Sequence, residues 1–198
     1  MDEGYIKFNC NWIASSDIPV HIVAELNFWR NKLYKKGLIG VYSDGIGYGN
    51  ISVRLNNQSF LISGTATGSL ETLNESHYSR VTNYSFSTNS ITCIGPLKAS
   101  SESLTHASIY ECSTEFNAVI HIHNLNLWNN LIHQVPTSNE NIAYGTAEMA
   151  NEIKRLFNET TLNTEKIIVM GGHQEGIISF GKDLEEAVAV LIKKIEYL

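Results

Sequence analysis

The sequence predicts one folded domain, residues 1–198, that mixes α-helices with β-strands. Of its 198 residues, 43% are hydrophobic and 17% are charged, which is typical of a globular protein with a sizeable core. Some segments alternate apolar and polar residues, which is the period of a half-buried strand, and others place apolar residues on one helical stripe. Both kinds of segment recur along the chain, so we expect an α/β fold.

The charge balance and the cysteines argue against several classes of protein. A net charge of −6 disfavours a general nucleic-acid binder, which needs clustered Lys and Arg to neutralise phosphates. Cys10, Cys93 and Cys112 are odd in number and far apart in sequence, which disfavours a disulfide framework and fits a reducing cytoplasm. Residues 1–15 lack the features of a signal peptide, and no apolar run approaches the roughly 20 residues of a membrane helix. We therefore expect a cytoplasmic protein with neither a membrane nor a nucleic acid as partner.

The first half of the chain predicts a strand, a helix and a hairpin. Apolar and polar residues alternate over residues 5–13, which predicts the strand. The helix ends at Gly37, and its apolar stripe consists of Ile22, Leu26, Trp29 and Leu33. The hairpin pairs residues 51–55 with residues 60–63. Residues 73–95 predict a turn of helix and two short strands around residues 85–90.

The second half predicts further helices that alternate with strands. A helix over residues 102–112 precedes a strand over residues 118–124, and a short helical piece and a loop follow in residues 124–136. A longer helix follows residues 144–146, and residues 167–170 and 177–180 predict a second hairpin. Asp183 is the expected N-cap of the last helix, whose buried face would consist of Leu184, Val188, Leu191, Ile195 and Leu198.

Two histidines in the strand over residues 118–124 suggest a metal site. Side chains alternate faces along a strand, so His121 and His123 share one face, while the apolar residues between and before them point to the other. Glu102 lies 19 residues before His121, and His173 lies in a later turn. Catalytic zinc sites use three protein ligands and leave one position open. The alternative is that these are buried histidines with ordinary hydrogen bonds. His106, four residues after Glu102, is expected to orient a ligand or to be structural.

Three small-residue segments are candidate anion sites. Residues 41–50 and 63–68 are rich in glycine and hydroxyl side chains, which permits close backbone approach and offers amides to an anion, although plain connecting loops also have this composition. Ser100 and Ser101 open a helix, where hydroxyls serve either as caps or as ligands of a phosphate.

The order of these motifs resembles one family. The runs G-N-I-S-V-R, L-I-S-G-T-A-T-G, K-A-S-S-E, H-A-S-I-Y, A-V-I-H-I-H, Y-G-T-A-E-M and G-H-Q-E-G-I-I-S-F-G-K-D-L-E-E-A are together similar to the class II aldolase and adducin head family over about residues 20–195. The resemblance implies a three-layer α/β/α fold around a mainly antiparallel central sheet. It also implies a homotetramer with sites at the subunit interfaces.

The resemblance also implies roles for individual residues. His121, His123 and His173 match the family's zinc ligands, and Glu102 matches its catalytic acid/base. The positions that match the substrate-phosphate site are Gly49, Asn50, Ser100 and Ser101, with Thr67 and Gly68 preferred over Gly64 and Thr65 in a turn that is longer than the family pattern.

The implied activity is that of a metal-dependent lyase. Zinc, or another divalent metal, would act as a Lewis acid for the enediolate that forms when a carbon–carbon bond of a small sugar phosphate, or a related hydroxy-carbonyl compound, breaks. Glu102 would move the proton at the resulting carbanion carbon. Epimerase, dehydratase and decarboxylase chemistry use the same logic. A scaffold domain, and a protein that binds a phosphosugar without turnover, are the alternatives outside catalysis.

Three departures from the family pattern stand out. Only 21 residues separate His123 from Gly145, so we expect the segment that carries the family's tyrosine proton donor to be absent. His173 is followed by Gln174, Glu175 and Gly176, which places an additional carboxylate near the metal. The chain stops just after its last helix, so we expect no C-terminal contribution to a neighbouring site.

Overall fold

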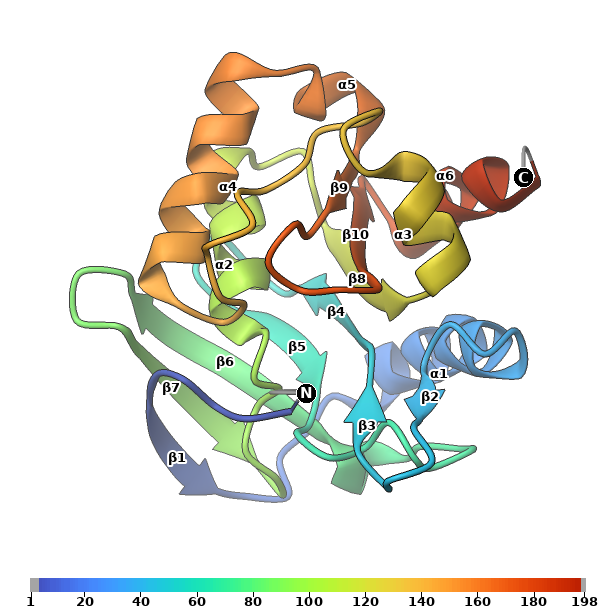
Figure 1. Cartoon of the computed structure of the whole chain (residues 1–198). Helices are drawn as coiled ribbons and strands as arrows, with labels where there is room; N and C mark the ends of the chain where they lie inside the picture. The colour runs from blue at the N-terminus through green and yellow to red at the C-terminus, as the bar shows by residue number, and fades with distance from the viewer. Residues whose placement is uncertain (1–3, 197–198) are drawn as a thin grey trace.

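The computed structural model describes residues 4–196 and is centred on one large sheet (Figure 1). The strands of this sheet are β1 (Asn9–Ala14), β4 (Asn50–Arg54), β5 (Phe60–Ser63), β6 (Tyr78–Ser85), β7 (Ser90–Gly95), β8 (Ala118–His123), β9 (Ile167–Val169) and β10 (Gly176–Gly181). They lie in the order β1-β7-β6-β5-β4-β8-β10-β9, and every neighbouring pair is antiparallel except β1 and β7. A separate ribbon pairs β2 (Gly40–Val41) with β3 (Gly47–Tyr48).

Helices cover both faces of the sheet (Figure 1). The helices on one face are α1 (Val20–Lys35), α3 (Leu125–Leu131) and α6 (Leu184–Glu196), and their buried residues form one apolar cluster with that face. A second cluster joins the other face to α2 (Ser103–Cys112), α4 (Ala147–Glu159) and α5 (Leu162–Glu165). A single 3-10 turn, Glu75–His77, precedes β6. The three-layer α/β/α fold with a mainly antiparallel sheet is thereby confirmed.

Strand β8 shows how the sequence pattern becomes this arrangement. Ala118, Ile120 and Ile122 belong to the cluster under α1 and α6, whereas Val119 belongs to the cluster under α2 and α4. Because side chains alternate, His121 and His123 lie on the same face as Val119. The predicted direction of both histidines is confirmed.

Some element boundaries differ from the prediction. The first strand begins at Asn9 and not at residue 5, because its partner β7 begins at Ser90 and Asn9 pairs with that residue. The two strands expected near residues 85–90 are longer: β6 ends at Ser85, β7 begins at Ser90, and residues 86–89 form the connection between them. The start of helix α4 at Ala147, after the N-cap Thr146, agrees with the prediction.

The last helix matches its prediction closely. The Asp183 carboxylate accepts a hydrogen bond of 2.8 Å from the backbone amide of Glu186, as expected for an N-cap. Leu184, Val188 and Leu191 are buried, and Ile195 is half-buried against the same cluster. Leu198, the remaining residue of the expected face, lies outside the described residues.

Cysteines and surface features bear on the function classes. All three cysteines are free thiols, although Cys10 and Cys93 lie on neighbouring strands with their sulfur atoms 3.8 Å apart. Within residues 4–196, no helix has both the length and the apolar character needed to cross a bilayer.

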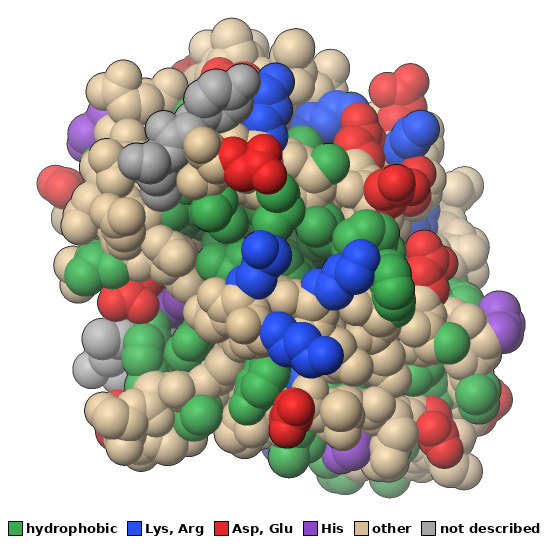
Figure 2. Space-filling view, turned by 90° about the vertical axis from the view of Figure 1, so that its right-hand side faces the viewer, with side chains coloured by type: hydrophobic (Ala, Val, Ile, Leu, Met, Phe, Trp, Pro, Cys, Tyr) green, Lys and Arg blue, Asp and Glu red, His purple; other side chains and the backbone are tan. Residues whose placement is uncertain are grey.

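On the face that carries α1 and α6, hydrophobic and basic side chains lie side by side (Figure 2). The groove there is lined by Trp29, Lys32, Leu33, Lys35, Lys36, Val188 and Ile192.

The packing of β8 gives a stability prediction. Ile120 is fully buried, so Ile120→Ala should lower the free energy of unfolding by about 2–5 kcal/mol through the loss of buried contacts and the cavity left behind. Ile13, on strand β1, is 48% exposed, and Ile13→Ala should cost less than about 1 kcal/mol. Urea unfolding followed by circular dichroism measures both. Equal losses for the two variants would contradict the central position of β8.

Candidate metal centre and anion pocket

Two adjacent elements bring three histidines together. Strand β8 carries His121 and His123, and the turn between β9 and β10 carries His173. Strand β10 is antiparallel to β8, with Gly176 opposite His123, so the turn lies beside the end of β8. The three rings have centroid separations of 4.7–5.2 Å, and one nitrogen from each lies within 4.8 Å of the others. All three side chains are buried, and together they form a group that can hold a metal ion.

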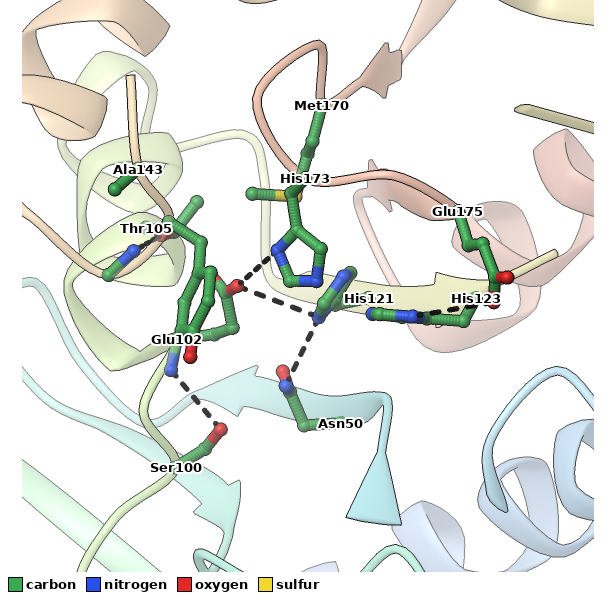
Figure 3. A network of polar contacts seen from close by, with 12 residues as sticks. Asn50, Ser100, Glu102, Thr105, His121, His123, Ala143, Met170, His173 and Glu175 are labelled. Atoms are coloured by element: carbon green, nitrogen blue, oxygen red, sulfur yellow. Dashed lines mark hydrogen bonds and ion pairs between the residues drawn. The ribbon is translucent and has the colours of Figure 1, made fainter. Parts of the chain in front are cut away.

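Glu102 faces the same point from helix α2, of which it is the N-cap residue (Figure 3). Its Oε1 atom lies 3.5 Å from His173 Nδ1 and 3.9 Å from His121 Nδ1. The residue is 1% exposed, and neither carboxyl oxygen has a hydrogen-bond partner among the described residues. Buried polar atoms without partners are costly, and they commonly mark a site for an ion.

Burial also keeps two of the imidazoles in the form that binds metals. The pKa values of His121 and His123 lie well below the usual value of 6.5, first because burial disfavours the charged ring and second because the neighbouring histidines add repulsion. Both rings are therefore neutral near pH 7, which is the state in which a histidine binds a metal. The neutral His121 ring cannot form an ion pair with Glu102. A divalent cation would satisfy the carboxyl oxygens and the ring nitrogens together, so the residues present fit a metal.

A small polar pocket lies next to these histidines. It is lined by Gly4, Gly47, Gly49, Asn50, Gly64, Thr65, Ala66, Thr67, Gly68, Ser100 and Ser101. All six residues predicted for phosphate binding line it, and so do Gly64 and Thr65, so the two alternative alignments of the turn describe one pocket. Its described lining contains no Lys or Arg and offers amides, hydroxyls and one carboxamide. Asn50 connects it to the histidines, because its Nδ2 atom lies 3.4 Å from His121 Nδ1.

Glycine is required where the pocket's loops approach other backbone. Gly49 has φ +78°, and a Cβ atom there would lie 2.8 Å from Ile39 Cγ1. A Cβ atom on Gly68 would lie 2.6 Å from the carbonyl oxygen of Gly40. Both positions exclude a side chain, since ordinary contacts to Cβ are longer than 3.4 Å. The glycines thus let two loops close on one small space.

The sequence did not predict a role for Arg30, whose side chain binds the backbone of the loop that contains Thr67 and Gly68. The side chain is 1% exposed and donates hydrogen bonds to the carbonyl oxygens of Glu71, Thr67 and Gly68 at 2.7–3.2 Å. Burial lowers the pKa of its guanidinium below its ordinary value. The available signal was a charge on the apolar stripe of α1, four residues after Leu26.

Tyrosines around the histidines were also missed. The Tyr42 hydroxyl lies 2.6 Å from His123 Nδ1, and the Tyr48 ring stacks on His123 at 5.3 Å. The Tyr144 ring packs against His173 at 4.6 Å. None of these contacts has a sequence spacing that would have predicted it. The additional carboxylate, Glu175, does lie at this site, since its Oε2 atom is 4.0 Å from His123 Nδ1.

His106 has a structural environment. Its Nδ1 atom lies 2.7 Å from the Ser52 hydroxyl, which in turn contacts the Tyr110 hydroxyl at 2.7 Å. The side-chain hydrogen bond therefore goes to the strand beside β8 and not to a candidate ligand. Of the two roles expected for His106, the structural one agrees with these contacts.

Arg30 gives a prediction about the loop it holds. Arg30→Met should lower the free energy of unfolding by about 2–4 kcal/mol, because three carbonyl groups, two of them in buried hydrogen bonds, lose a donor. Arg80 makes a half-exposed pair with Asp17 at 3.7 Å, and Arg80→Met should cost less than about 1 kcal/mol. Chemical denaturation of both variants measures the difference. A loss for Arg30→Met no larger than that for Arg80→Met would contradict this role.

His106 gives a prediction about acid. Burial lowers its pKa to about 3, whereas a histidine in an unfolded chain has a pKa of about 6.5. Between these pH values only the unfolded chain takes up the proton, so stability falls as the pH decreases through this window. His106→Gln should make the fall in unfolding free energy, measured in chelator-treated protein, shallower by up to about 1.4 kcal/mol per pH unit. His21→Gln, on the exposed side of α1, should leave the slope as it is.

Comparisons with known proteins concern the family and the fold. The family model described as Class II Aldolase and Adducin N-terminal domain matches residues 32–197. No curated protein gives a significant sequence match. An L-fuculose 1-phosphate aldolase structure superposes with a TM-score of 0.66 and 20% identity, covering 92% of this chain and 85% of that one.

Two further structures show the same fold. A sugar-phosphate aldolase from Thermotoga maritima gives a TM-score of 0.65 at 19% identity, covering 89% of this chain and 93% of the other. YgbL from Escherichia coli, a candidate aldolase, epimerase or decarboxylase, gives 0.64 at 16% identity, covering 87% and 84%. At these identities the likeness concerns the fold, whereas the family match extends over most of the sequence. The chain therefore belongs to the class II aldolase and adducin N-terminal domain family.

Proposed function

We propose that this chain is a divalent-metal-dependent lyase that cleaves a carbon–carbon bond of a small sugar phosphate, or of a related hydroxy-carbonyl compound, by aldol-type chemistry. One observation carries the proposal: three buried imidazoles and the Glu102 carboxylate converge beside a pocket of amides and hydroxyls. The names of two structural neighbours, an L-fuculose 1-phosphate aldolase and a sugar-phosphate aldolase, support the substrate class.

His121, His123 and His173 are the proposed metal ligands, and zinc is the metal that three imidazoles favour. A metal bound there would act as a Lewis acid toward a substrate carbonyl. The substrate phosphate would lie in the adjacent pocket, where the proposed contacts are Gly49, Asn50, Thr67, Gly68, Ser100 and Ser101. Because Asn50 lies between pocket and histidines, a phosphate held there orients the rest of a short substrate toward them.

Glu102 is the proposed acid/base. Its carboxyl group faces the histidines from the start of α2, so it would reach a carbon next to the substrate carbonyl. Burial of the surrounding side chains excludes water and leaves this carboxyl group to move the proton. Epimerisation, dehydration and decarboxylation need the same proton transfer, and YgbL is a candidate for two of these reactions.

A scaffold role is the alternative outside catalysis. Burying the Glu102 carboxyl group, whose oxygens have no hydrogen-bond partner among the described residues, without a bound ion would lower the stability of a domain that only binds partners. This cost favours the enzyme. We also propose that the protein is cytoplasmic and forms a homo-oligomer, with a tetramer favoured. Light scattering of purified protein would measure the number of subunits.

Metal content and substitution of Glu102 test the proposal. Purified protein should contain about one divalent metal per chain by mass spectrometry, and it should release dihydroxyacetone phosphate, pyruvate or carbon dioxide from a member of a panel of ketose phosphates and hydroxy acids. Glu102→Gln should retain the metal and lower kcat at least about 100-fold, in the range that general acid–base groups supply. His121→Ala should lose the metal.

Glu148 is exposed on α4, so Glu148→Gln is the matched control and should change neither metal content nor kcat. Protein without stoichiometric metal, together with a His121→Ala variant that differs from wild type in stability alone, would reject the enzyme in favour of a scaffold. Binding of a phosphosugar without turnover would favour a carrier.

A further inference from the structure

The end of β8 carries a three-residue chain of polar contacts that the proposed reaction does not use. Tyr42 is the residue after strand β2. Its hydroxyl lies 2.6 Å from His123 Nδ1 and 2.8 Å from Glu175 Oε2. It therefore bridges an imidazole and a carboxylate that are themselves 4.0 Å apart (Figure 3 shows the latter two). The three residues come from segments far apart in the sequence, near residues 42, 123 and 175.

The direction of these hydrogen bonds follows from the groups involved. A carboxylate accepts hydrogen bonds and donates none, so the Tyr42 hydroxyl donates its single proton to Glu175. The same oxygen then accepts from His123, which places a proton on His123 Nδ1. Because Nδ1 carries the proton, His123 would bind a metal through Nε2.

The backbone holds Glu175 in this place. Its φ angle is +72°, a conformation that costs a residue other than glycine free energy and that persists when the surroundings impose it. Its carbonyl oxygen accepts a hydrogen bond of 3.0 Å from the amide of Asn124, and the next residue, Gly176, pairs with His123 in the sheet. The turn that carries His173 is thus tied to the end of β8 at the position where Glu175 meets Tyr42.

We propose that Tyr42 and Glu175 are positioning residues, which fix the tautomer and ring orientation of His123 for the metal. The inference rests on the proposed metal centre. A carboxylate that acts on a ligand histidine is a common device, and its loss typically weakens metal binding 10–100-fold. In this chain the carboxylate acts through a tyrosine hydroxyl. This gives a role to the additional carboxylate after His173.

Tyr48 provides a matched control. Its ring stacks on His123, and it also packs against Tyr42 at 4.6 Å, but its hydroxyl donates to the carbonyl oxygen of Gly37. Tyr42→Phe and Tyr48→Phe therefore remove the same atom from two neighbouring rings. Only the first of them removes a hydrogen bond to the imidazole.

Metal affinity is the main measurement. Competition of zinc-loaded protein with a chromophoric chelator should show a Kd about 10–100-fold higher for Tyr42→Phe. Glu175→Gln should weaken binding in the same direction, and the double variant should be no weaker than the weaker single one, because the two residues act as one chain. The Co²⁺ form should show an altered visible spectrum in Tyr42→Phe. Tyr48→Phe should stay within threefold of wild type with an unchanged spectrum.

A second measurement does not depend on the metal. In metal-free protein, ¹⁵N NMR of the histidine rings should show His123 protonated on Nδ1, and Tyr42→Phe should shift this resonance while Tyr48→Phe should not. Equal zinc affinity for the Tyr42→Phe and Tyr48→Phe variants would overturn the inference and leave the proposed function in place. If the wild-type protein binds no metal, the proposed function fails. The NMR measurement still tests the inference in that case, because a His123 tautomer that is the same in all variants would overturn it.

Discussion

The double pairing of strand β8 is the constraint on which both the fold and the candidate site depend. The strand lies between β4 and β10, and all six of its side chains are buried. A shift in register by one residue would turn every one of them to the opposite face. Ile120 and Ile122 are needed in the core under α1 and α6, so His121 and His123 are held toward α2 and α4. Apolar packing on one side of the sheet thus sets the direction of the polar groups on the other.

This arrangement places costly groups where apolar packing can offset them. The Glu102 oxygens are buried without hydrogen-bond partners among the described residues, and Glu175 adopts a backbone conformation that disfavours a side chain. The buried charge of Arg30 is compensated by three carbonyl groups, and the described residues include no acidic partner for it. Such departures from local preference are expected where a site, rather than the fold, has determined the residue.

The sequence sufficed for features that depend on local periodicity. Alternation in β8 predicted which face carries the histidines, and the cap and stripe of α6 predicted the last helix. The order of short motifs predicted the family, and the six residues that it assigned to phosphate binding all line the small polar pocket. Features that depend on tertiary contacts were not accessible. The start of β1 is set by the length of its partner β7, and Arg30, Tyr42 and Tyr144 reach the site only because distant segments meet there.

The N-terminal segment forms part of the surroundings of the candidate site. Gly4 lines the small polar pocket, the amide of Tyr5 donates to the Tyr144 hydroxyl, and the Lys7 ammonium lies 3.5 Å from the centre of the Tyr144 ring. That ring packs against His173. The family match begins at residue 32, so these residues lie before the matched part of the chain. Two separate stretches of the chain therefore meet around His173, and a substitution before residue 32 can alter the surroundings of this histidine although it lies outside the matched domain.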